Sequence, residues 1–188
     1  MKRFLPFFLM FFLLTSCASK TTTEYAEEII MFYDGVSSFD CESVIYADYY
    51  DFVTEYRVEF EYNSGNSCVK IVEPADIAGF TVEFDDGLYR ILYDDANLEL
   101  LTLGNSDISP AEMLSRLVYQ WKNGYMTECA AVIKDGVECI MISFSQNNGE
   151  MMYYTYFEKE NFKPVCAEIT YNGKKILTCN FESVSFAD

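Results

Sequence analysis

The strongest indication of the fold is the stretch Thr54-Glu55-Tyr56-Arg57-Val58-Glu59-Phe60-Glu61-Tyr62. Its apolar and aromatic side chains alternate with charged ones, which is the period of a β-strand with one buried face and one face in water. This alternation is typical of antiparallel sheets, because one of their faces commonly meets solvent. The stretch therefore predicts an antiparallel sheet whose buried face carries Val58 and Phe60.

On both sides of this stretch, further short strands are separated by turn sequences, of which Asn172-Gly173 is the strongest hairpin signal. Lys134-Asp135-Gly136 is expected to form a three-residue hairpin loop. The pattern predicts eight to ten strands, which lie near residues 41–47, 54–62, 68–72, 80–84, 88–93, 129–133, 137–144 and 151–157 and on both sides of Asn172-Gly173. The fold class is α+β, mainly antiparallel β, with one curved sheet and helices on one of its faces.

Two helices are predicted. Thr21 and Glu24 have the spacing of a capping box, and an apolar stripe follows it as far as Gly35. The second helix begins after Ser109, with Pro110 at its first position and Glu112 as a reciprocal cap. Its apolar stripe is Leu114, Leu117, Val118 and Trp121, and Gly124 ends it.

The inward face of the sheet is the candidate ligand surface. Val58, Phe60, Phe80, Val82 and Phe84 share the buried parity of their strands and should face Leu117 and Trp121 of the second helix. The chain is rich in aromatic residues, with 16 Phe and 15 Tyr. These residues either fill a closed core or, if the sheet is half open, line an apolar concave face that holds an acyl chain.

The N-terminus has the profile of an export signal. Lys2 and Arg3 precede the apolar run Phe4–Leu14, which is too short for a membrane span of about 20 helical residues. The run ends in Leu14-Thr15-Ser16-Cys17, which resembles the bacterial lipobox, whose cysteine is lipidated. The alternative is an ordinary secretory signal in which Cys17 is incidental. We expect a signal peptide at 1–16, a lipid-anchored tether at 17–22 and one domain at 23–188, on the extracytoplasmic side of the cell membrane.

Charge narrows the range of partners. The chain has 13 basic and 30 acidic residues, and loss of two basic residues with the leader changes the net charge from −17 to −19. A nucleic-acid partner is excluded, because such binding needs Lys and Arg against phosphates. The same charge is repelled by an anionic bilayer, so the domain should stand off the membrane that holds its anchor.

Cysteines can cross-link an exported chain. If Asn172-Gly173 is a two-residue turn without a bulge, Cys166 faces Cys179 in a non-hydrogen-bonded pair, whose Cα separation of about 4.5 Å permits a disulfide. Alternatively, every cysteine after Cys17 stays reduced as a small buried side chain. The six concerned are Cys41, Cys68, Cys129, Cys139, Cys166 and Cys179.

Enzyme motifs are missing from the sequence. It has no histidine, no G-x-S-x-G, no P-loop and no G-x-G-x-x-G. The acid pairs Asp85-Asp86 and Asp94-Asp95 lack the spacing of a calcium loop and are interpreted as turns. We therefore expect no cofactor, no metal and no catalytic residue; the alternative is an envelope enzyme with an unmarked carboxylate or lysine site.

The order of elements resembles the LolA/LolB-like lipoprotein superfamily, in particular single-membrane lipoproteins similar to the germination lipoprotein group. The likeness rests on Pro74 followed by Ile77-Ala78-Gly79 and on Phe162-Lys163-Pro164-Val165 before the last hairpin. It implies an open β-barrel whose apolar concave face is covered by helices. It also implies a non-enzymatic module that binds lipid, acyl chains or a partner envelope protein. Only Cys17 carries over as a functional residue, and an anchor there favours a fixed binder over a soluble shuttle.

Overall fold

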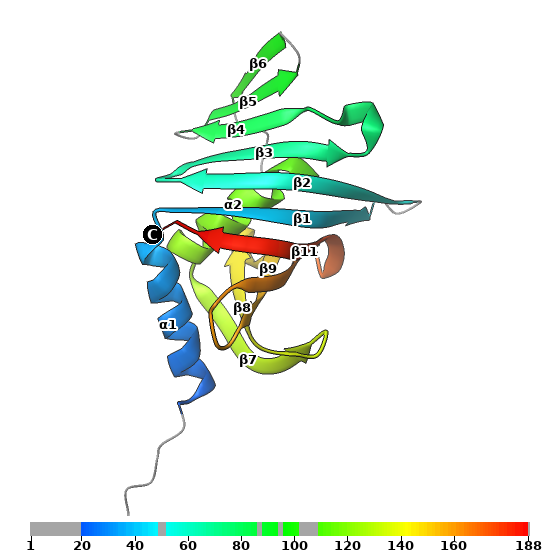
Figure 1. Ribbon diagram of the computed structural model, residues 1–188. Coiled ribbons are helices and arrows are strands. Elements are labelled where there is room, and N and C mark those ends of the chain that lie inside the picture. Colours follow the sequence, from blue (N-terminus) through cyan, green and yellow to red (C-terminus); the bar gives the residue numbers. More distant parts are fainter. Residues whose placement is uncertain (1–19, 49–51, 86–87, 94–95, 102–108, 188) are drawn as a thin grey trace, which may run out of the picture.

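The computed structural model describes residues 20–48, 52–85, 88–93, 96–101 and 109–187. They form two α-helices and one antiparallel sheet of eleven strands (Figure 1). The helices are α1 (Thr22–Gly35) and α2 (Pro110–Asn123). The strands are β1 (Ser38–Asp48), β2 (Val53–Asn63), β3 (Asn66–Glu73), β4 (Thr81–Asp85), β5 (Leu88–Tyr93), β6 (Ala96–Leu101), β7 (Met126–Lys134), β8 (Val137–Gln146), β9 (Met151–Glu158), β10 (Pro164–Tyr171) and β11 (Lys174–Phe186).

The sheet is open and strongly curved. Its strand order is β6-β5-β4-β3-β2-β1-β11-β10-β9-β8-β7, so β6 and β7 lie at opposite edges. In Figure 1 the strands β6, β5, β4, β3, β2, β1 and β11 follow one another from top to bottom in a stack. Below this stack, β9, β8 and β7 run in a different direction. Helix α2 packs against β1 to β4, and α1 packs against α2, β7 and β8. The predicted α+β class, with a curved open sheet and helices on its concave face, is confirmed.

Local sequence explains most of the elements. In β2 the residues Val58, Phe60 and Tyr62 are buried while Glu59 and Glu61 are exposed, as the alternation predicts. The Asn172-Gly173 turn is present, with φ of 49° and 76°, the left-handed region that a tight hairpin requires. The capping box at Thr21 is also confirmed, because its side chain accepts from the Glu24 amide and the Glu24 carboxylate accepts from the Thr21 amide. Helix α1 thus begins at Thr22, within the segment expected to be tether.

Three details of the sequence prediction are wrong. The sheet has eleven strands, because a sixth strand, β6, pairs with β5 at the edge, and the short alternation Ala96-Asn97-Leu98-Glu99-Leu100 is left out of the predicted strands. The β7–β8 loop has two residues, since Lys134 pairs directly with Val137. Glu112 does not complete a capping box; it is buried and pairs with Arg116 one turn later in α2.

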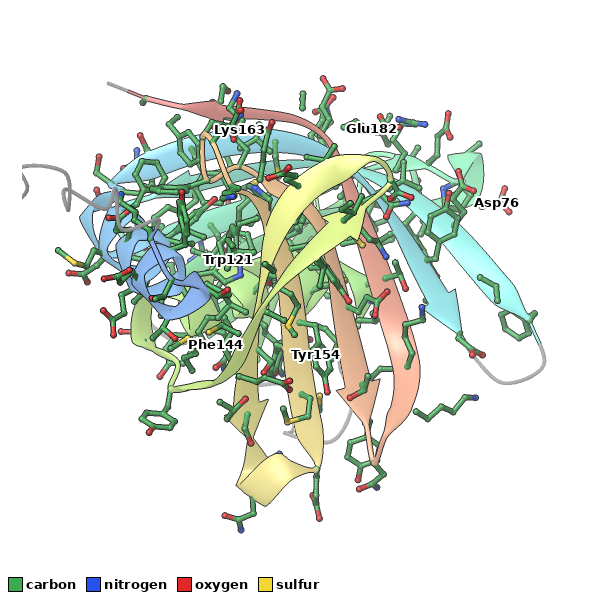
Figure 2. The ribbon with its side chains drawn as sticks, turned by 90° about the horizontal axis from the view of Figure 1, so that it is seen from below. Asp76, Trp121, Phe144, Tyr154, Lys163 and Glu182 are labelled. Atoms are coloured by element: carbon green, nitrogen blue, oxygen red, sulfur yellow. The ribbon has the colours of Figure 1, made fainter. Side chains whose placement is uncertain are left out.

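An aromatic core fills the space between α1, α2 and the strands on either side of β11. At its centre is Trp121, which is 2% exposed and donates from its indole nitrogen to the Thr155 hydroxyl at 2.9 Å. Its ring centroid lies 4.9 Å from that of Tyr33 and 5.4 Å from that of Phe157. Figure 2 shows Trp121 and Phe144 enclosed by the helices and strands, whereas Asp76, Lys163 and Glu182 lie at the periphery. This part of the molecule is thus filled by buried side chains.

Candidate functional site

Among the residues that the structure describes, two cavities lie between α2 and strands β2 to β5. The first, which we call the N-terminal cavity, is beside the start of α2 and has a volume of about 260 Å³. Ala111 and Glu112 of α2 face apolar side chains across it. Its other lining residues are Ile71, Ile77, Phe80, Val82, Tyr89, Ile91 and Ser109. The wall is almost wholly hydrocarbon and aromatic, which suits an apolar guest.

The second, the C-terminal cavity, lies further along the same side of α2 and has a volume of about 420 Å³. It is lined by Tyr62, Gly65, Ser67, Phe84, Ser115, Val118, Tyr119 and Asn123. A hydrogen bond of 2.7 Å between the buried hydroxyls of Ser67 and Ser115 ties β3 to α2. The neighbouring Val69 of β3 has no exposed surface. The two cavities therefore share the α2–β3 interface.

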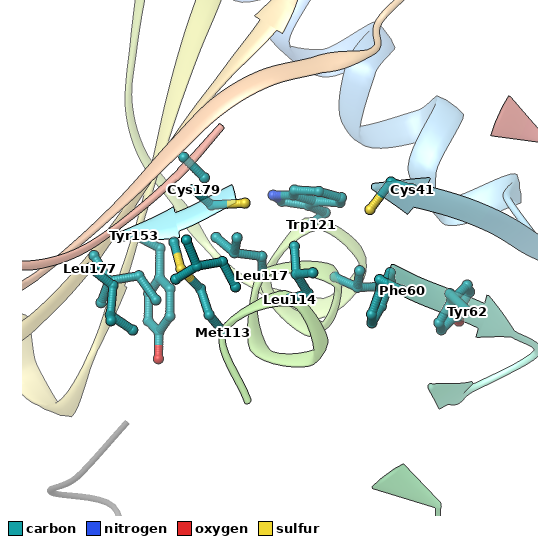
Figure 3. Packing of buried hydrophobic residues seen from close by; sticks show 14 of the residues in the cluster. Cys41, Phe60, Tyr62, Met113, Leu114, Leu117, Trp121, Tyr153, Leu177 and Cys179 are labelled. Atoms are coloured by element: carbon teal, nitrogen blue, oxygen red, sulfur yellow. The ribbon is translucent and has the colours of Figure 1, made fainter. Parts of the chain in front are cut away.

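The seven residues expected to face a ligand are divided between cavity and core. Phe80 and Val82 line the N-terminal cavity, and Phe84 lines the C-terminal cavity. The other four, Val58, Phe60, Leu117 and Trp121, are buried in the packed core. Figure 3 shows Phe60, Leu117 and Trp121 within this cluster, with Leu114 between Leu117 and Phe60. Ligand contact by Phe80, Val82 and Phe84 stays a proposal.

Sequence reasoning missed several lining residues. Tyr89 and Ile91 of β5 line the N-terminal cavity. They pair with Phe84 and Val82 of β4, respectively. The alternation of the predicted strand at 88–93 could have located them. Glu112 was interpreted as a helix cap, and no local signal shows that it is buried instead.

Glu112 and Arg116 form a buried ion pair at the wall of the N-terminal cavity. Glu112 has no exposed surface, and its Oε2 accepts from Arg116 Nε at 3.0 Å and from Nη2 at 2.8 Å. Burial raises the pKa of Glu112, which the ion pair with Arg116 and the nearby Ser109 hydroxyl oppose. The charged pair thus lies beside the hydroxyls of Ser109 and Tyr89, and the other side chains of the cavity wall are apolar.

A third hollow, of about 260 Å³, lies at the ends of β2 to β5 and differs in chemistry. It contains the carboxylates of Glu61, Glu83 and Asp85 together with Arg90. Glu83 is paired with Arg90 at 3.0 Å, and both side chains are more than a third exposed. This is a solvated, salt-bridged surface, where ion pairs contribute little.

The expected register of the last hairpin is wrong. A bulge between Ile169 and Thr170 shifts the pairing by one residue, so that Cys166 faces Asn180 and Cys179 faces Ala167. The geometric ground for a Cys166–Cys179 bridge is thereby removed, and both residues are free thiols in the structure. The turn itself forms as predicted, with Tyr171 paired to Lys174, so the error comes from the bulge alone.

The other four cysteines in the described residues are also free thiols. Cys41 and Cys179 lie in the core on either side of Trp121 (Figure 3). Burial raises the pKa of the Cys41 thiol to about 12 and that of Cys179 well above its usual value. Both side chains therefore behave as small hydrophobic residues rather than as nucleophiles.

Solved structures with the same architecture identify the fold as LolA/LolB-like. A putative outer membrane lipoprotein-sorting protein domain from Vibrio parahaemolyticus matches with a TM-score of 0.52 and 9% identity, covering 87% of this chain and 91% of that one. A LolA superfamily protein from Nitrosomonas europaea matches with a TM-score of 0.51 and 11% identity, covering 90% and 95%. An uncharacterized conserved protein from Thermus thermophilus matches with a TM-score of 0.54 and 6% identity, covering 89% of each chain.

Sequence comparison adds no relative to these. No protein-family model matches the chain, and no curated protein does. The likeness to the solved structures shows the fold alone, so the chemistry of the cavities has to carry the functional argument.

The described part of the chain contains no helix that is long and apolar enough to cross a membrane. Cys17 and the expected signal peptide lie outside the described residues.

Proposed function

We propose that this chain is an extracytoplasmic lipoprotein that binds the acyl or alkyl chains of a lipid between α2 and strands β2 to β5, without catalysing a reaction. The observation that carries the proposal is the N-terminal cavity. Its wall consists of apolar and aromatic side chains, Glu112 and Ser109 excepted. Transfer of apolar surface from water into such a wall is favourable by about 25 cal/mol per Å² and requires no polar partner.

The position of the cavities supports the same proposal. They lie at the edge of the packed core, between a helix and a sheet that does not close, so a chain can enter without crossing the aromatic cluster around Trp121. The N-terminal cavity, about 260 Å³, is smaller than the usual range for ligand sites, and the C-terminal cavity, about 420 Å³, is at the small end of that range. Part of a lipid, rather than a whole phospholipid, fits in each one.

The test is native mass spectrometry of the mature chain, residues 17–188, produced without lipid and measured with and without added phospholipid. We expect a lipid adduct in the wild-type chain. Val82→Trp fills the N-terminal cavity and should abolish the adduct, because Val82 is 8% exposed and lies in its wall.

The matched control is Val53→Trp. Val53 is 63% exposed on β2 and lines neither cavity, so this variant should retain the adduct. Far-UV circular dichroism must show that both variants keep the β-rich fold. If the wild-type chain retains no lipid in either sample, acyl binding is wrong, and binding of a partner envelope protein becomes the better hypothesis.

The anchor is a separate part of the proposal. Leu14-Thr15-Ser16-Cys17 supports attachment of a diacylglyceryl group to the Cys17 thiol, and two acyl chains are enough for stable membrane retention. Cys17→Ala should abolish both fatty-acid labelling and membrane retention in cells. Labelling that persists in this variant would contradict the anchor while leaving the binding site untested by that result.

A further inference from the structure

The two cavities follow one another along the same three elements. On β3, Ile71 lines the N-terminal cavity and Ser67 lines the C-terminal cavity. Val69 lies between them on the strand, lines neither cavity and has no exposed surface. On β4, Val82 lines the first cavity and Phe84 lines the second, and α2 contributes residues to both in the same order. The cavities are thus neighbouring compartments, and what separates them decides how long a chain can fit.

Two contacts close the space between the compartments. Next to α2, the hydroxyls of Ser67 and Ser115 are hydrogen-bonded at 2.7 Å, and because both side chains are short, helix and strand lie close together there. Next to β5, the ring centroids of Phe84 and Tyr89 are 4.9 Å apart. Of the two cavities, Phe84 lines the C-terminal one and Tyr89 lines the N-terminal one. The two rings in contact therefore lie between the cavities.

The N-terminal cavity alone has room for a chain of limited length. A methylene group takes up a volume similar to that of one water molecule in the liquid, about 30 Å³. The cavity volume of about 260 Å³ therefore accommodates an alkyl chain of about nine carbons. Further carbons of a longer chain would stay outside this cavity and bury no more apolar surface in it, so they would add no affinity.

We propose that the N-terminal cavity binds one alkyl chain of medium length, about nine carbons, and that the contact between Phe84 and Tyr89 sets this limit. This inference rests on the proposed function and adds to it the length of the chain that is bound. Phe84 is the specificity-determining residue, because removal of its ring would join the two cavities. The Ser67–Ser115 contact would remain, since it brings the helix and the strand themselves together.

The test measures how affinity depends on chain length. The probes are hexyl, octyl, decyl, dodecyl and tetradecyl glucoside, which share one neutral head group, each used below the concentration at which it forms micelles. Each methylene that enters the cavity should lower the dissociation constant about fourfold. For the mature wild-type chain, the dissociation constant should fall from hexyl to decyl glucoside and then stay level. Titration calorimetry gives the five dissociation constants.

Phe84→Ala is the informative variant. Loss of the ring opens the N-terminal cavity into the C-terminal one, so this variant should bind dodecyl glucoside about tenfold more tightly than decyl glucoside. Tyr119→Ala is the matched control, because it also removes an aromatic ring from the wall of the C-terminal cavity. Tyr119 is an exposed residue of α2 and does not line the N-terminal cavity, so the control should keep the wild-type limit.

The outcomes separate the two proposals. If the affinity of the wild-type chain keeps rising from decyl to tetradecyl glucoside, the length limit is wrong, although alkyl binding stands. The role of Phe84 is wrong if Phe84→Ala keeps the wild-type limit, or if Tyr119→Ala removes the limit to the same extent. If no glucoside binds to the wild-type chain, the proposed function and this inference both fail. The wild-type series decides the length limit even if Phe84→Ala does not fold.

Discussion

The two sides of α2 differ in side-chain size, and this difference separates core from cavity. The packed side carries Leu117 and Trp121, both at most 2% exposed, against α1 and the strands around β11. The hollow side carries Ala111 and Ser115, which face β3 to β5 and border the two cavities. Both sides belong to one helix and face one sheet.

Small residues spaced four apart along α2 leave room for the two cavities. Ala111 and Ser115 are four residues apart and therefore lie one above the other on the same side of α2. Their short side chains fill less of the space beside the curved sheet than larger ones would, although Ser115 still reaches β3 through its hydrogen bond to Ser67. Large side chains thus fill the core on one side of the helix, and small side chains leave space on the other.

The largest expected effect is on the packed side. Trp121→Ala should lower the free energy of unfolding by about 3–5 kcal/mol, because it removes a buried ring and leaves the fully buried Thr155 hydroxyl without its donor. Phe84→Ala on the hollow side should cost only about 1–2 kcal/mol, since Phe84 is half-buried and already borders a cavity. Urea unfolding of both variants measures the difference. Equal losses would mean that the two sides are packed alike.

A smaller effect is expected where α1 meets α2. Lys122 Nζ donates to the carbonyl oxygens of Tyr33, Asp34 and Val36 at 2.7, 3.1 and 2.8 Å, at the C-terminal end of α1. The last turn of α1 has no basic residue of its own, so Lys122 supplies the cation that the helix dipole favours. Lys122→Met should cost about 1–2 kcal/mol.

Lys70→Met is the control for that measurement. Lys70 pairs with Glu59 on the outer face, where both side chains are about half exposed, and its loss should cost well under 1 kcal/mol. If the two lysine variants lose equal stability, Lys122 does not fix α1 onto α2, and the packed side depends on apolar contacts alone.

The smallest effect concerns the thiols and leaves stability unchanged. Cys41 and Cys179 of the packed core should resist iodoacetamide in the native protein, because both are buried and their raised pKa values keep them protonated. Cys68 and Cys129, which are partly exposed, should react first. Mass mapping after brief alkylation identifies the modified residues. Early labelling of Cys41 would show that the packed side opens more readily than its contacts imply.

Much of the fold could be predicted from local patterns, since they act over a few residues. The alternation in β2, the capping box at Thr21 and the Asn172-Gly173 turn all occur as expected. The prediction failed where the outcome depends on contacts between distant segments. The bulge at Ile169 and Thr170 is such a case, because it shifts every pair beyond it without altering the turn that begins the hairpin.

The candidate site was predicted only in part for the same reason. Parity correctly placed Phe80, Val82 and Phe84 on the inner face, but it could not tell them from Val58 and Phe60, which share that parity and are buried in the core. Whether an inward side chain meets another side chain or a cavity depends on what α2 places opposite it. Glu112 shows the same limit, since its burial depends on strands far away in sequence.

Local patterns specify the antiparallel α+β class, both helices and the inward parity of the strands, because periodicity and capping depend on neighbouring residues alone. Contacts between distant segments specify which inward residues border a cavity, that Glu112 is buried beside one, and that Cys166 and Cys179 do not face each other. The first two outcomes depend on how the curved sheet packs against α2, and the third depends on a bulge in the pairing of β10 with β11; a local pattern contains no information about either.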